Sequence, residues 1–352
     1  MLQLKNIHKS FQDFSIEGIN LDIHPGDYYV ILGKSGAGKT IVLETIAGLL
    51  IPDKGTILMQ GQDITIKRIQ ERKTGIVFQD YAVFPHKTVY QNIAYPLKRK
   101  YKKSEIKKRV KDLARKTGVE NLLHRYPGTM SGGEVQRTVL SRTLAMEPEI
   151  LLLDEPLTSL DVQYKRELQS LLRELNQEGL TIIHVTHDYQ EALALANRIA
   201  VMNDGKIIQE GTTKEVFQNP GNKFIADFVG IRNFFVAAIE SVNNASHKIA
   251  KITDTIRLFI SNDIQNGDKK IITIDANNII ISEKRLESTA LNNFEGRITD
   301  VIPIINGLEV IVDIGVKLAV IITEKSFKRL ALSLGKTVWV SFKASAVHVQ
   351  NF

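Results

Sequence analysis

One glycine-rich segment limits the fold of this chain more than any other feature. Residues 33–40, GKSGAGKT, match the pattern G-x-x-x-x-G-K-[ST] and lie between an apolar run at 28–32 and a helix-like segment at 41–49. Glycines let the backbone curl so that successive N–H groups converge, and the following helix adds partial positive charge at the same point. In this context the pattern predicts a strand, a phosphate-binding loop and a helix.

This loop predicts the binding of a nucleotide with Mg²⁺. Lys39 is expected to reach the β- and γ-phosphates, and the Thr40 hydroxyl is expected to ligate the metal ion. The residues predicted to bind the phosphates are Gly33, Lys34, Ser35, Gly36, Ala37, Gly38, Lys39 and Thr40. The loop by itself does not specify a reaction.

A pair of adjacent carboxylates suggests what the reaction is. The apolar run at 150–153 ends in Asp154 and Glu155, and open α/β sheets place their ligands at the carboxyl ends of strands. We expect Asp154 to hold a hydrated Mg²⁺ and Glu155 to polarise the attacking water. Beside a phosphate-binding loop, these two carboxylates predict hydrolysis of the bound nucleotide.

The first ~230 residues alternate strand-like and helix-like segments, which is typical of an α/β domain with a largely parallel sheet. The strand-like runs are short and almost continuously apolar, as expected where helices cover both faces of the sheet. We expect strands at 28–32, 75–78, 150–153 and 181–185. Helices are expected after Gly38, Gly133, Asp161 and Asp188.

After Gly230 the chain changes to short strands broken by Asn, Gly and Asp, which predicts an all-β, barrel-like domain at 231–352. Part of this domain repeats. Gly267 is followed, after a strand, by a segment that starts at Ala276, and Gly335 is followed, after a strand of equal length, by a similar segment that starts at Ala344. We expect two copies of one small β-unit, at about 235–283 and about 286–352.

The chain of 352 residues contains no cysteine, which excludes disulfide scaffolds, cysteine-ligated zinc, iron–sulfur clusters and thiol nucleophiles. This composition fits a reducing compartment. No stretch approaches the ~20 apolar residues that cross a bilayer, so we expect no membrane-spanning helix. The first residues show no apolar run after a basic start, and no secretory signal is expected.

The formal net charge of +7 is concentrated in a basic segment at 98–116. Within it, Ile106, Val110, Leu113 and Ala114 recur at helical spacing. This pattern favours an amphipathic helix with a solvated basic face over a surface that binds nucleic acid or lipid headgroups.

Further motifs follow in a fixed order around the two carboxylates. SGGE at 131–134 precedes the strand of Asp154, SLD at 159–161 follows Glu155, and His187 closes the strand at 181–185. In order and spacing, residues 1 to about 230 resemble the ATPase subunit of an ABC transporter. The resemblance implies an α/β P-loop ATPase domain at 1–230, with a helical subdomain at about 85–148 and ATP as the nucleotide.

The resemblance also implies a site that is divided between two chains. Ser131, Gly132 and Gly133 match the family signature, which contacts the γ-phosphate of ATP held by a partner subunit. Physically, this is a second helix N-terminus that offers donors to an anion. Asp161 matches the aspartate that helps to link the two sites. Hydrolysis would then require a head-to-tail homodimer.

Three more residues acquire roles by the same resemblance. Gln79 matches a glutamine that touches Mg²⁺ and water, and residues 81–89 resemble the surface that receives a membrane subunit. His187 matches a histidine that hydrogen-bonds the γ-phosphate and orients the nucleophile. In this family an aromatic residue near the amino terminus stacks on adenine. We expect Phe11 in this role, with Phe14 as the alternative.

The end of the chain, at 338–349, is similar to the molybdate-binding β-barrel domain found in molybdate and tungstate importer ATPases. This similarity implies an OB-like regulatory domain in which hydroxyls, N–H groups and one lysine hold a tetrahedral dianion. The matching positions are Ser288, Thr289, Asn292, Lys343, Ala344 and Ser345. Leu291 stands where the family usually has arginine, which removes a charge-assisted donor. The alternative for 343–345 is a strand edge with an exposed lysine.

Together the resemblances imply the ATPase subunit of a molybdate or tungstate importer at the cytoplasmic face of the cell membrane. Its expected partners are a second copy of the chain, two transmembrane permease subunits and an extracytoplasmic oxyanion-binding protein. Oxyanion bound to the second domain is expected to inhibit the ATPase by feedback.

Other functions remain open. The cargo of an importer of this class could instead be sulfate or thiosulfate, iron(III), a polyamine or a sugar, and an oxyanion sensor or storage protein is a further alternative. An ABC ATPase that acts on DNA or ribosomes is disfavoured, because the chain has no long coiled-coil insertion, no second ATPase in tandem and no aromatic-interleaved basic surface. No nucleic-acid partner is expected.

Overall fold

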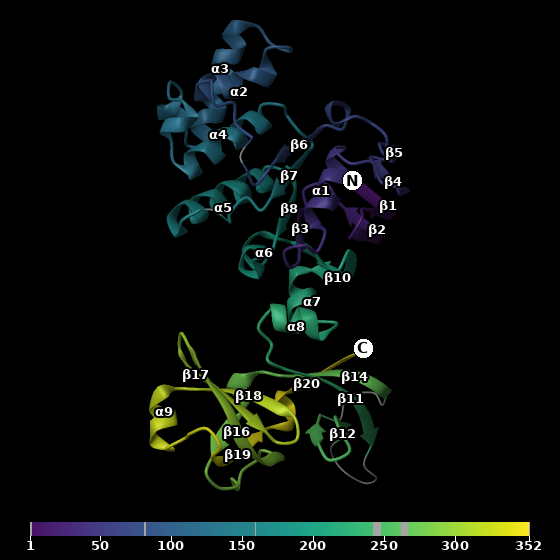
Figure 1. The fold of residues 1–352 in the computed structure, drawn as a ribbon, viewed down its shortest axis with the longest axis vertical. Coiled ribbons are helices and arrows are strands. Elements are labelled where there is room, and N and C mark those ends of the chain that lie inside the picture. The colour runs from purple at the N-terminus through teal and green to yellow at the C-terminus, as the bar shows by residue number, and fades with distance from the viewer. Residues whose placement is uncertain (1, 81, 159, 242–247, 262–266, 352) are drawn as a thin grey trace. The chain divides into compact units, whose positions relative to one another are not determined.

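The computed structural model describes residues 2–80, 82–158, 160–241, 248–261 and 267–351 (Figure 1). Tyr81 and Ser159, which belong to the motifs above, lie outside these residues. The chain forms two compact units, Met1–Val216 and Phe217–Phe352. The division comes before the expected boundary near residue 230, because α8 (Lys223–Phe228) contacts β11 (Asn233–Ser241) of the second unit.

A six-stranded sheet with the order β10-β9-β3-β8-β7-β6 forms the centre of the first unit. Its parallel strands are β3 (Tyr28–Leu32), β6 (Thr74–Val77), β7 (Ile150–Asp154), β8 (Thr181–Thr186) and β9 (Arg198–Asn203). β10 (Lys206–Thr212) is antiparallel to β9. Every residue of β3, β7 and β8 is buried, which explains their continuous apolar sequences. The expected strands and the parallel sheet are confirmed, with small differences at the strand ends.

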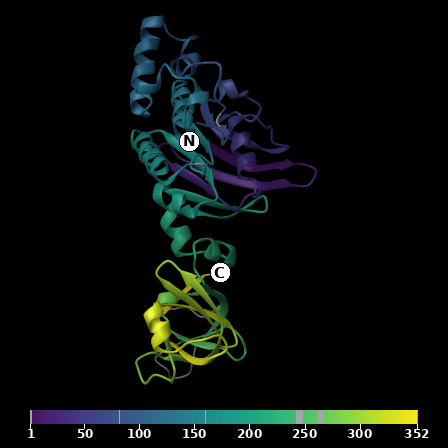
Figure 2. The ribbon, with the colours of Figure 1, turned by 60° about the vertical axis from the view of Figure 1, so that its left-hand side comes forward.

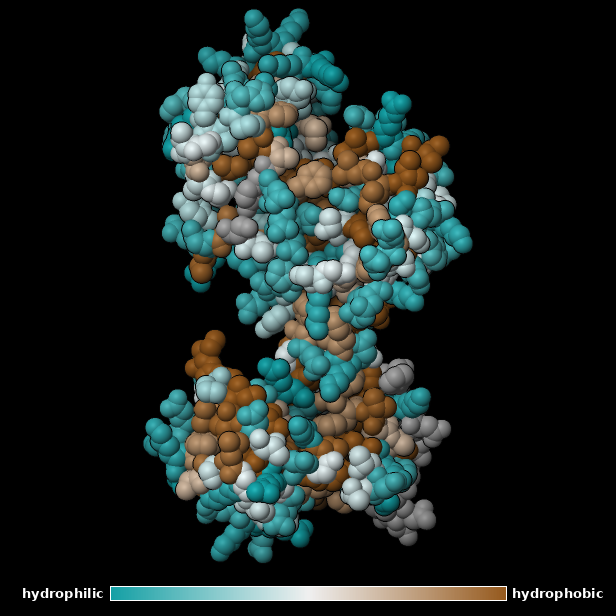
Figure 3. All heavy atoms as spheres, viewed as in Figure 1, coloured by the Kyte–Doolittle hydropathy of each residue, from teal (hydrophilic) through white to brown (hydrophobic). Residues whose placement is uncertain are grey.

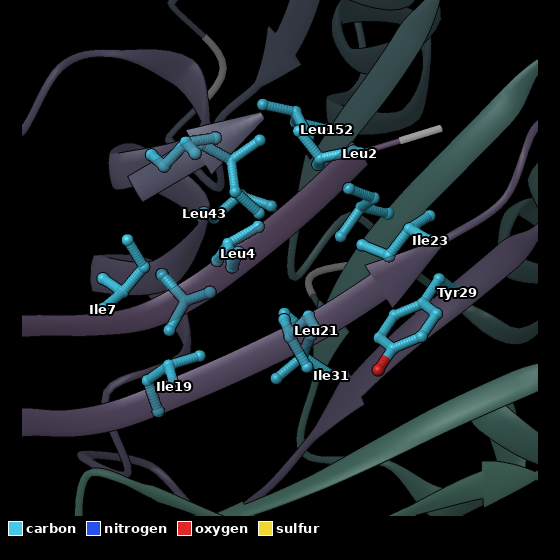
Figure 4. Packing of buried hydrophobic residues seen from close by; sticks show 14 of the residues in the cluster. Leu2, Leu4, Ile7, Ile19, Leu21, Ile23, Tyr29, Ile31, Leu43 and Leu152 are labelled. Atoms are coloured by element: carbon cyan, nitrogen blue, oxygen red, sulfur yellow. The ribbon is translucent and has the colours of Figure 1, made fainter. Parts of the chain in front are cut away.

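A second, antiparallel sheet with the order β2-β1-β4-β5 packs over one face of the first. Its strands are β1 (Leu2–Ser10), β2 (Ser15–Ile23), β4 (Lys54–Met59) and β5 (Gln62–Asp63). Figure 4 shows Leu4 and Ile19 from this sheet in one cluster with Ile31 of β3 and Leu43 of the helix that follows it. Each such side chain contributes roughly 1.5–3 kcal/mol when fully buried.

Helices follow the strands where the sequence predicts them. In the first unit they are α1 (Lys39–Ala47), α2 (Val89–Leu97), α3 (Lys103–Lys116), α4 (Gly132–Leu144), α5 (Val162–Gln177) and α6 (Tyr189–Leu195). The division between the units falls within α7 (Thr213–Gln218). Short 3₁₀ helices lie at Ile69–Glu71, Glu120–Leu122, Pro127–Thr129, Ala276–Asn278 and Ala344–Ala346. Within the described parts of the chain, none of the helices is both long and apolar enough to cross a membrane.

The helices α2 and α3 share a hydrophobic cluster that also includes Ala145, directly after α4, and that is separate from the cluster under the sheets. α3 presents Ile106, Val110 and Ala114 to this cluster and confirms the predicted apolar stripe. The helix begins at Lys103, so the basic residues at 98–102 precede it. In Figure 3, hydrophilic residues cover the outer end of this helical group.

The second unit contains two five-stranded antiparallel sheets, with the orders β13-β12-β11-β14-β20 and β15-β19-β16-β17-β18. Their strands after β11 are β12 (Lys248–Lys251), β13 (Arg257–Ile260), β14 (Gly267–Ile274), β15 (Ile280–Ser282), β16 (Asn292–Ile304), β17 (Gly307–Asp313), β18 (Lys317–Ile322), β19 (Thr337–Phe342) and β20 (Val347–Asn351). One helix, α9 (Glu324–Arg329), lies between β18 and β19. Figure 2 shows these strands curving around a common core.

The two sheets confirm the predicted repeat, and they also show that the two repeats exchange one strand each. β11 to β14 have the same connectivity as β16 to β19, and each set is followed by a 3₁₀ helix and one short strand. That short strand crosses into the other sheet, because β15 pairs with β19 and β20 pairs with β14. Each repeat therefore completes the sheet of the other, so neither sheet is complete within a single repeat.

A buried arginine closes the carboxyl end of α1. Arg72 is 1% exposed, and its guanidinium donates to the carbonyls of Thr45 (2.7 Å), Ile46 (3.0 Å), Thr65 (2.7 Å) and Lys67 (2.8 Å). These bonds satisfy helix carbonyls that lack partners within the helix. The guanidinium lies against Gly48, where a Cβ atom would be only 2.5 Å from the Arg72 Nε atom.

Gly48→Ala should therefore destabilise the first unit by more than backbone conformation alone explains. Gly61 is a matched control, since its φ of 79° is close to the 84° of Gly48 but a Cβ atom added to it would meet nothing within 4 Å. We expect about 1–2 kcal/mol for Gly61→Ala and about 2–5 kcal/mol for Gly48→Ala in urea unfolding. Equal losses would show that Arg72 yields to the added methyl group.

Candidate functional site

The register of the parallel strands brings the predicted site residues to one edge of the sheet. Leu32 at the end of β3 pairs with Thr186 at the end of β8, and Asp154 at the end of β7 pairs with Val185. The ladder continues past the strands, since the N–H of Gly33 donates to Thr186 (3.2 Å) and the N–H of Glu155 donates to Val185 (3.0 Å). The glycine-rich loop, the two carboxylates and His187 therefore leave the sheet together.

The glycines of the loop are required for different reasons. A Cβ atom on Gly33 would lie 2.4 Å from the carbonyl oxygen of Met202, and one on Gly38 would lie 2.9 Å from side-chain atoms of Ile16 and Met202. Gly36 has open space around it but a φ of 79°. Lys34, Ser35 and Gly36 are exposed and Ala37 is buried. The loop leads directly into the N-terminus of α1, whose unpaired N–H groups favour an anion.

The ammonium group of Lys39 lies inside the loop. Lys39 is 5% exposed, and its Nζ donates to the carbonyls of Gly33 (2.9 Å) and Lys34 (3.0 Å). Its Nζ also lies 3.7 Å from Oε1 of Glu155. Burial lowers the pKa of Lys39, and the charges of Glu155 and Asp154 oppose this shift. A cation is thus held where phosphate oxygens could replace the loop carbonyls as acceptors.

Thr40 and Asp154 place two hard oxygen atoms side by side. The Thr40 hydroxyl donates to Oδ1 of Asp154 at 3.1 Å. Asp154 is 6% exposed, and burial raises its pKa while the Thr40 hydrogen bond lowers it. Hydroxyl and carboxylate oxygens suit Mg²⁺, which usually takes few protein ligands and completes its shell with water and phosphate. No group of three or more candidate ligands of the His, Cys, Asp and Glu types occurs among the described residues.

Glu155 connects the loop with His187. Its backbone φ is 43°, a conformation that is strained for a residue other than glycine. Oε2 of Glu155 lies 3.1 Å from Nδ1 of His187 and accepts a hydrogen bond from the Thr158 hydroxyl at 3.2 Å. The His187 side chain is 44% exposed. Thr158 was not predicted, because nothing in its sequence context distinguishes this threonine from a surface residue.

Ser131 and Asp161 cap two helices. The Ser131 hydroxyl accepts from the N–H of Glu134 at 3.4 Å, and the Glu134 carboxylate accepts from the N–H of Ser131 at 2.8 Å. Asp161 accepts from the N–H groups of Gln163 and Tyr164, both at 3.1 Å. Within the described residues, the hydrogen bonds of Ser131 and Asp161 are all to neighbours in sequence.

The two signature glycines have different surroundings. A Cβ atom on Gly133 would lie 3.2 Å from the ring of Tyr164, whereas Gly132 has open space around it. Both lie in the first turn of α4, which Ser131 caps. The exposed tip of α4 therefore keeps its first N–H groups near open space.

The remaining residues predicted for the first unit are accessible. Gln79 is exposed and follows β6 at the same edge of the sheet. Phe11 is 45% exposed in the turn between β1 and β2, where its N–H donates to the carbonyl of Phe14 at 2.8 Å. Phe14 packs against the core. Of the two aromatic candidates, Phe11 has the ring with more accessible surface.

The residues predicted to bind an oxyanion come from two stretches that meet in the second unit. Asn292 pairs with Phe342, so Ser288 and Thr289 just before it lie at the same end of the strand pair as residues 343–345. Asn292 is 1% exposed, and its side-chain amide bonds to the backbone N (2.8 Å) and O (3.0 Å) of Phe259.

These hydrogen bonds hold the Asn292 amide against the backbone of Phe259, and they compete with any hydrogen bond from this amide to an anion. The other side chains in the two stretches, Ser288, Thr289, Lys343 and Ser345, are exposed, and Ala344 is half-buried. Ser288 also accepts a hydrogen bond from the N–H of Ala290 at 3.2 Å. Leu291 is 41% exposed at the position that lacks the family arginine.

Comparison with known proteins identifies both units. Residues 16–158 match the ABC transporter family, and residues 288–349 match the TOBE domain. The chain is similar to a molybdate/tungstate import ATP-binding protein from Pyrococcus abyssi, with 39% identity over 99% of this chain and 100% of that protein. It is also similar to a spermidine/putrescine import ATP-binding protein from Thermotoga maritima, with 39% identity over 84% of this chain and 82% of that protein.

Solved structures agree with this assignment. A dimeric ATP-binding cassette in a post-hydrolysis state, bound to ADP and phosphate, has a TM-score of 0.55 and 30% identity, and covers 60% of this chain and 99% of its own. A protein from Clostridium perfringens that is part of an ABC transporter complex has a TM-score of 0.58 and 33% identity, and the match covers 66% of this chain and 94% of that protein. The chain belongs to the ATP-binding subunits of ABC importers, ATPases coupled to transport, and carries an ABC ATPase fold followed by a TOBE domain.

Proposed function

We propose that this chain powers the import of molybdate or tungstate. The observation that carries the proposal is the extent of the likeness to the Pyrococcus abyssi molybdate/tungstate protein, which spans nearly the whole of both chains. Polyamine import is the second candidate, because the spermidine/putrescine protein has the same 39% identity as the molybdate/tungstate protein, although over a shorter part of the chain. The shared ATPase chemistry does not separate these cargoes, since the cargo does not bind to the nucleotide site.

The first unit supports the following arrangement for hydrolysis. ATP lies with its phosphates in the loop 33–40 and its adenine against Phe11. Phosphate oxygens take over the hydrogen bonds that Lys39 now makes to Gly33 and Lys34. Thr40, Asp154 and Gln79 would hold Mg²⁺, which would neutralise charge at the phosphates.

Glu155 and His187 act on the attacking water. The Glu155 carboxylate accepts the water proton, and its contacts with Thr158 and His187 fix its orientation. With Nδ1 of His187 donating to the Glu155 carboxylate, Nε2 would donate to the γ-phosphate from the imidazolium form, in which both ring nitrogens carry a proton. Lys39, 3.7 Å from the same carboxylate, balances the negative charge that collects between water and phosphate.

The site is completed by a second copy of the chain. Ser131, Gly132 and Gly133 at the tip of α4, together with Asp161, face the ATP of the partner in a head-to-tail homodimer. The dimeric state of a solved relative bound to ADP and phosphate supports this arrangement. The chain would assemble with two permease subunits and an extracytoplasmic binding protein at the cytoplasmic face of the membrane, a proposal supported by the import role in the names of its relatives.

Replacement of the proposed base tests the hydrolytic arrangement. Glu155→Gln should retain ATP binding and lose turnover by about 10²–10⁴-fold, because the amide cannot accept the water proton. Phosphate release and nucleotide binding should be measured on the assembled transporter. Glu149→Gln, a change at a solvent-accessible ion pair with Lys73, is the control. Normal hydrolysis by Glu155→Gln would show that another group is the base.

The cargo can be assigned by stimulation of the ATPase. The reconstituted transporter should hydrolyse ATP faster when the extracytoplasmic binding protein is loaded with molybdate or tungstate than when it is empty. Sulfate, iron(III), spermidine and maltose serve as comparison ligands. Stimulation by spermidine alone would replace the oxyanion proposal with polyamine import.

We further propose that oxyanion inhibits the ATPase by binding to Ser288, Thr289, Lys343, Ala344 and Ser345 in the second unit. Exposed hydroxyls and one ammonium group at the same end of a strand pair support this proposal. Asn292 contributes by holding the backbone of Phe259. Molybdate should lower ATP hydrolysis by the wild-type transporter, and Lys343→Ala should abolish this effect while the control Lys325→Ala preserves it. Hydrolysis that is unchanged up to millimolar molybdate would contradict the proposal.

A further inference from the structure

A network of buried and half-buried polar groups surrounds the backbone of His187, the residue that contacts Glu155. At its centre is Glu191 of α6, which is 2% exposed. Its Oε1 accepts from Nζ of Lys165 at 2.7 Å, and its Oε2 accepts from the Thr186 hydroxyl at 2.8 Å. Nε2 of the fully buried His184 lies 3.5 Å from the same Oε2. The network joins α5, β8 and α6, three consecutive elements of the chain.

The network holds the chain on both sides of His187. Thr186 precedes His187 and is bound to Glu191 as described. Asp188 follows His187, and its Oδ2 accepts from Nζ of Lys165 at 2.8 Å. The N–H of Asp188 also donates to the Thr186 hydroxyl at 3.0 Å. The backbone of His187 is therefore fixed at both ends by groups that depend on Lys165 and Glu191.

Both central groups are ionised at neutral pH. Burial alone would raise the pKa of Glu191, but the nearby His184 ring and the contacts with Lys165 and Thr186 outweigh it and bring the pKa to about 2. Burial would lower the pKa of Lys165, but its bonds to Asp188 and Glu191 raise it. Glu191 is buried and Lys165 is 29% exposed, so loss of Lys165 would leave the buried Glu191 charge without its ammonium partner.

We propose that Glu191 and Lys165 are positioning residues for ATP hydrolysis, which hold the Thr186–Asp188 backbone so that His187 faces Glu155. Neither side chain contacts the glycine-rich loop in the hydrogen bonds of the described chain, so their effect passes through His187. Lys165 also lies one turn after Asp161, the cap of α5, and its N–H donates to the Asp161 carbonyl at 2.9 Å. A shift of the amino-terminal end of α5 is thereby transmitted to His187. The inference rests on the proposed roles of Glu155 and His187.

The charge of Glu191 can be removed with little change of shape. We expect Glu191→Gln, in the full chain within the assembled transporter, to lower kcat for ATP hydrolysis by about 10–100-fold with little change in KM or nucleotide binding. The matched control is Glu167→Gln. Glu167 lies on the same helix as Lys165 and forms an ion pair with Arg137. This control should leave kcat unchanged.

A His187→Ala background separates positioning from general stability. If Glu191 acts through His187, Glu191→Gln should lower the residual rate no further in that background, because coupled changes are not additive. An equal fold-loss in both backgrounds would overturn the proposal, as would an unchanged kcat in a folded Glu191→Gln protein. Where thermal unfolding shows that Glu191→Gln does not fold, Thr186→Val provides the same test, since it removes the hydroxyl that joins Glu191 to the Asp188 N–H.

The outcome is distinguishable from a failure of the proposed hydrolytic arrangement. A wild-type rate for Glu155→Gln would remove the base on which the inference depends, whatever Glu191→Gln does. A slow Glu155→Gln combined with a fast, folded Glu191→Gln would overturn the inference alone.

Discussion

The parallel alignment of β3, β8, β7 and β6 determines where the reactive side chains of the first unit lie. Parallel strands end at one edge of the sheet, so the loop after β3, the carboxylates after β7 and the histidine after β8 meet without long connections. A shift of β7 by one residue would turn Asp154 to the opposite face and away from Thr40. The 3.1 Å contacts of Thr40 with Asp154 and of Glu155 with His187 are therefore properties of the sheet register.

The sequence could predict that the candidate site residues of this unit lie close together, because their chemistry coincides with a local change of structure. Lys39 lies in a glycine pattern between a strand and a helix, and Asp154 and Glu155 end an apolar run. His187 carries no such local signal and was identified only through the family resemblance. The fold class followed from the same alternation, since buried parallel strands and the helices between them have distinct periodicities.

Features that depend on contacts between distant segments could not be predicted. The buried role of Arg72 requires α1 to end beside it, and the exchange of β15 and β20 requires two repeats to pair across one core. Asn292 resembles an anion ligand in sequence, yet its amide binds the backbone of Phe259. Glu191 likewise looks like a surface residue of an amphipathic helix until Lys165 and Thr186 are brought to it.

The edge of the sheet that we propose binds nucleotide carries both conformational and electrostatic strain. Glu155 holds a φ of 43°, which costs roughly 1–2 kcal/mol for a residue other than glycine. Burial disfavours the charged forms of Lys39 and Asp154, because it lowers the pKa of the first and raises that of the second. The hydrophobic cluster beneath the loop offsets these costs. In the arrangement that we propose, a bound triphosphate and its cation would relieve these costs directly, because phosphate would accept from Lys39 and the cation would neutralise Asp154. The binding energy would then be concentrated at the groups proposed to hydrolyse ATP.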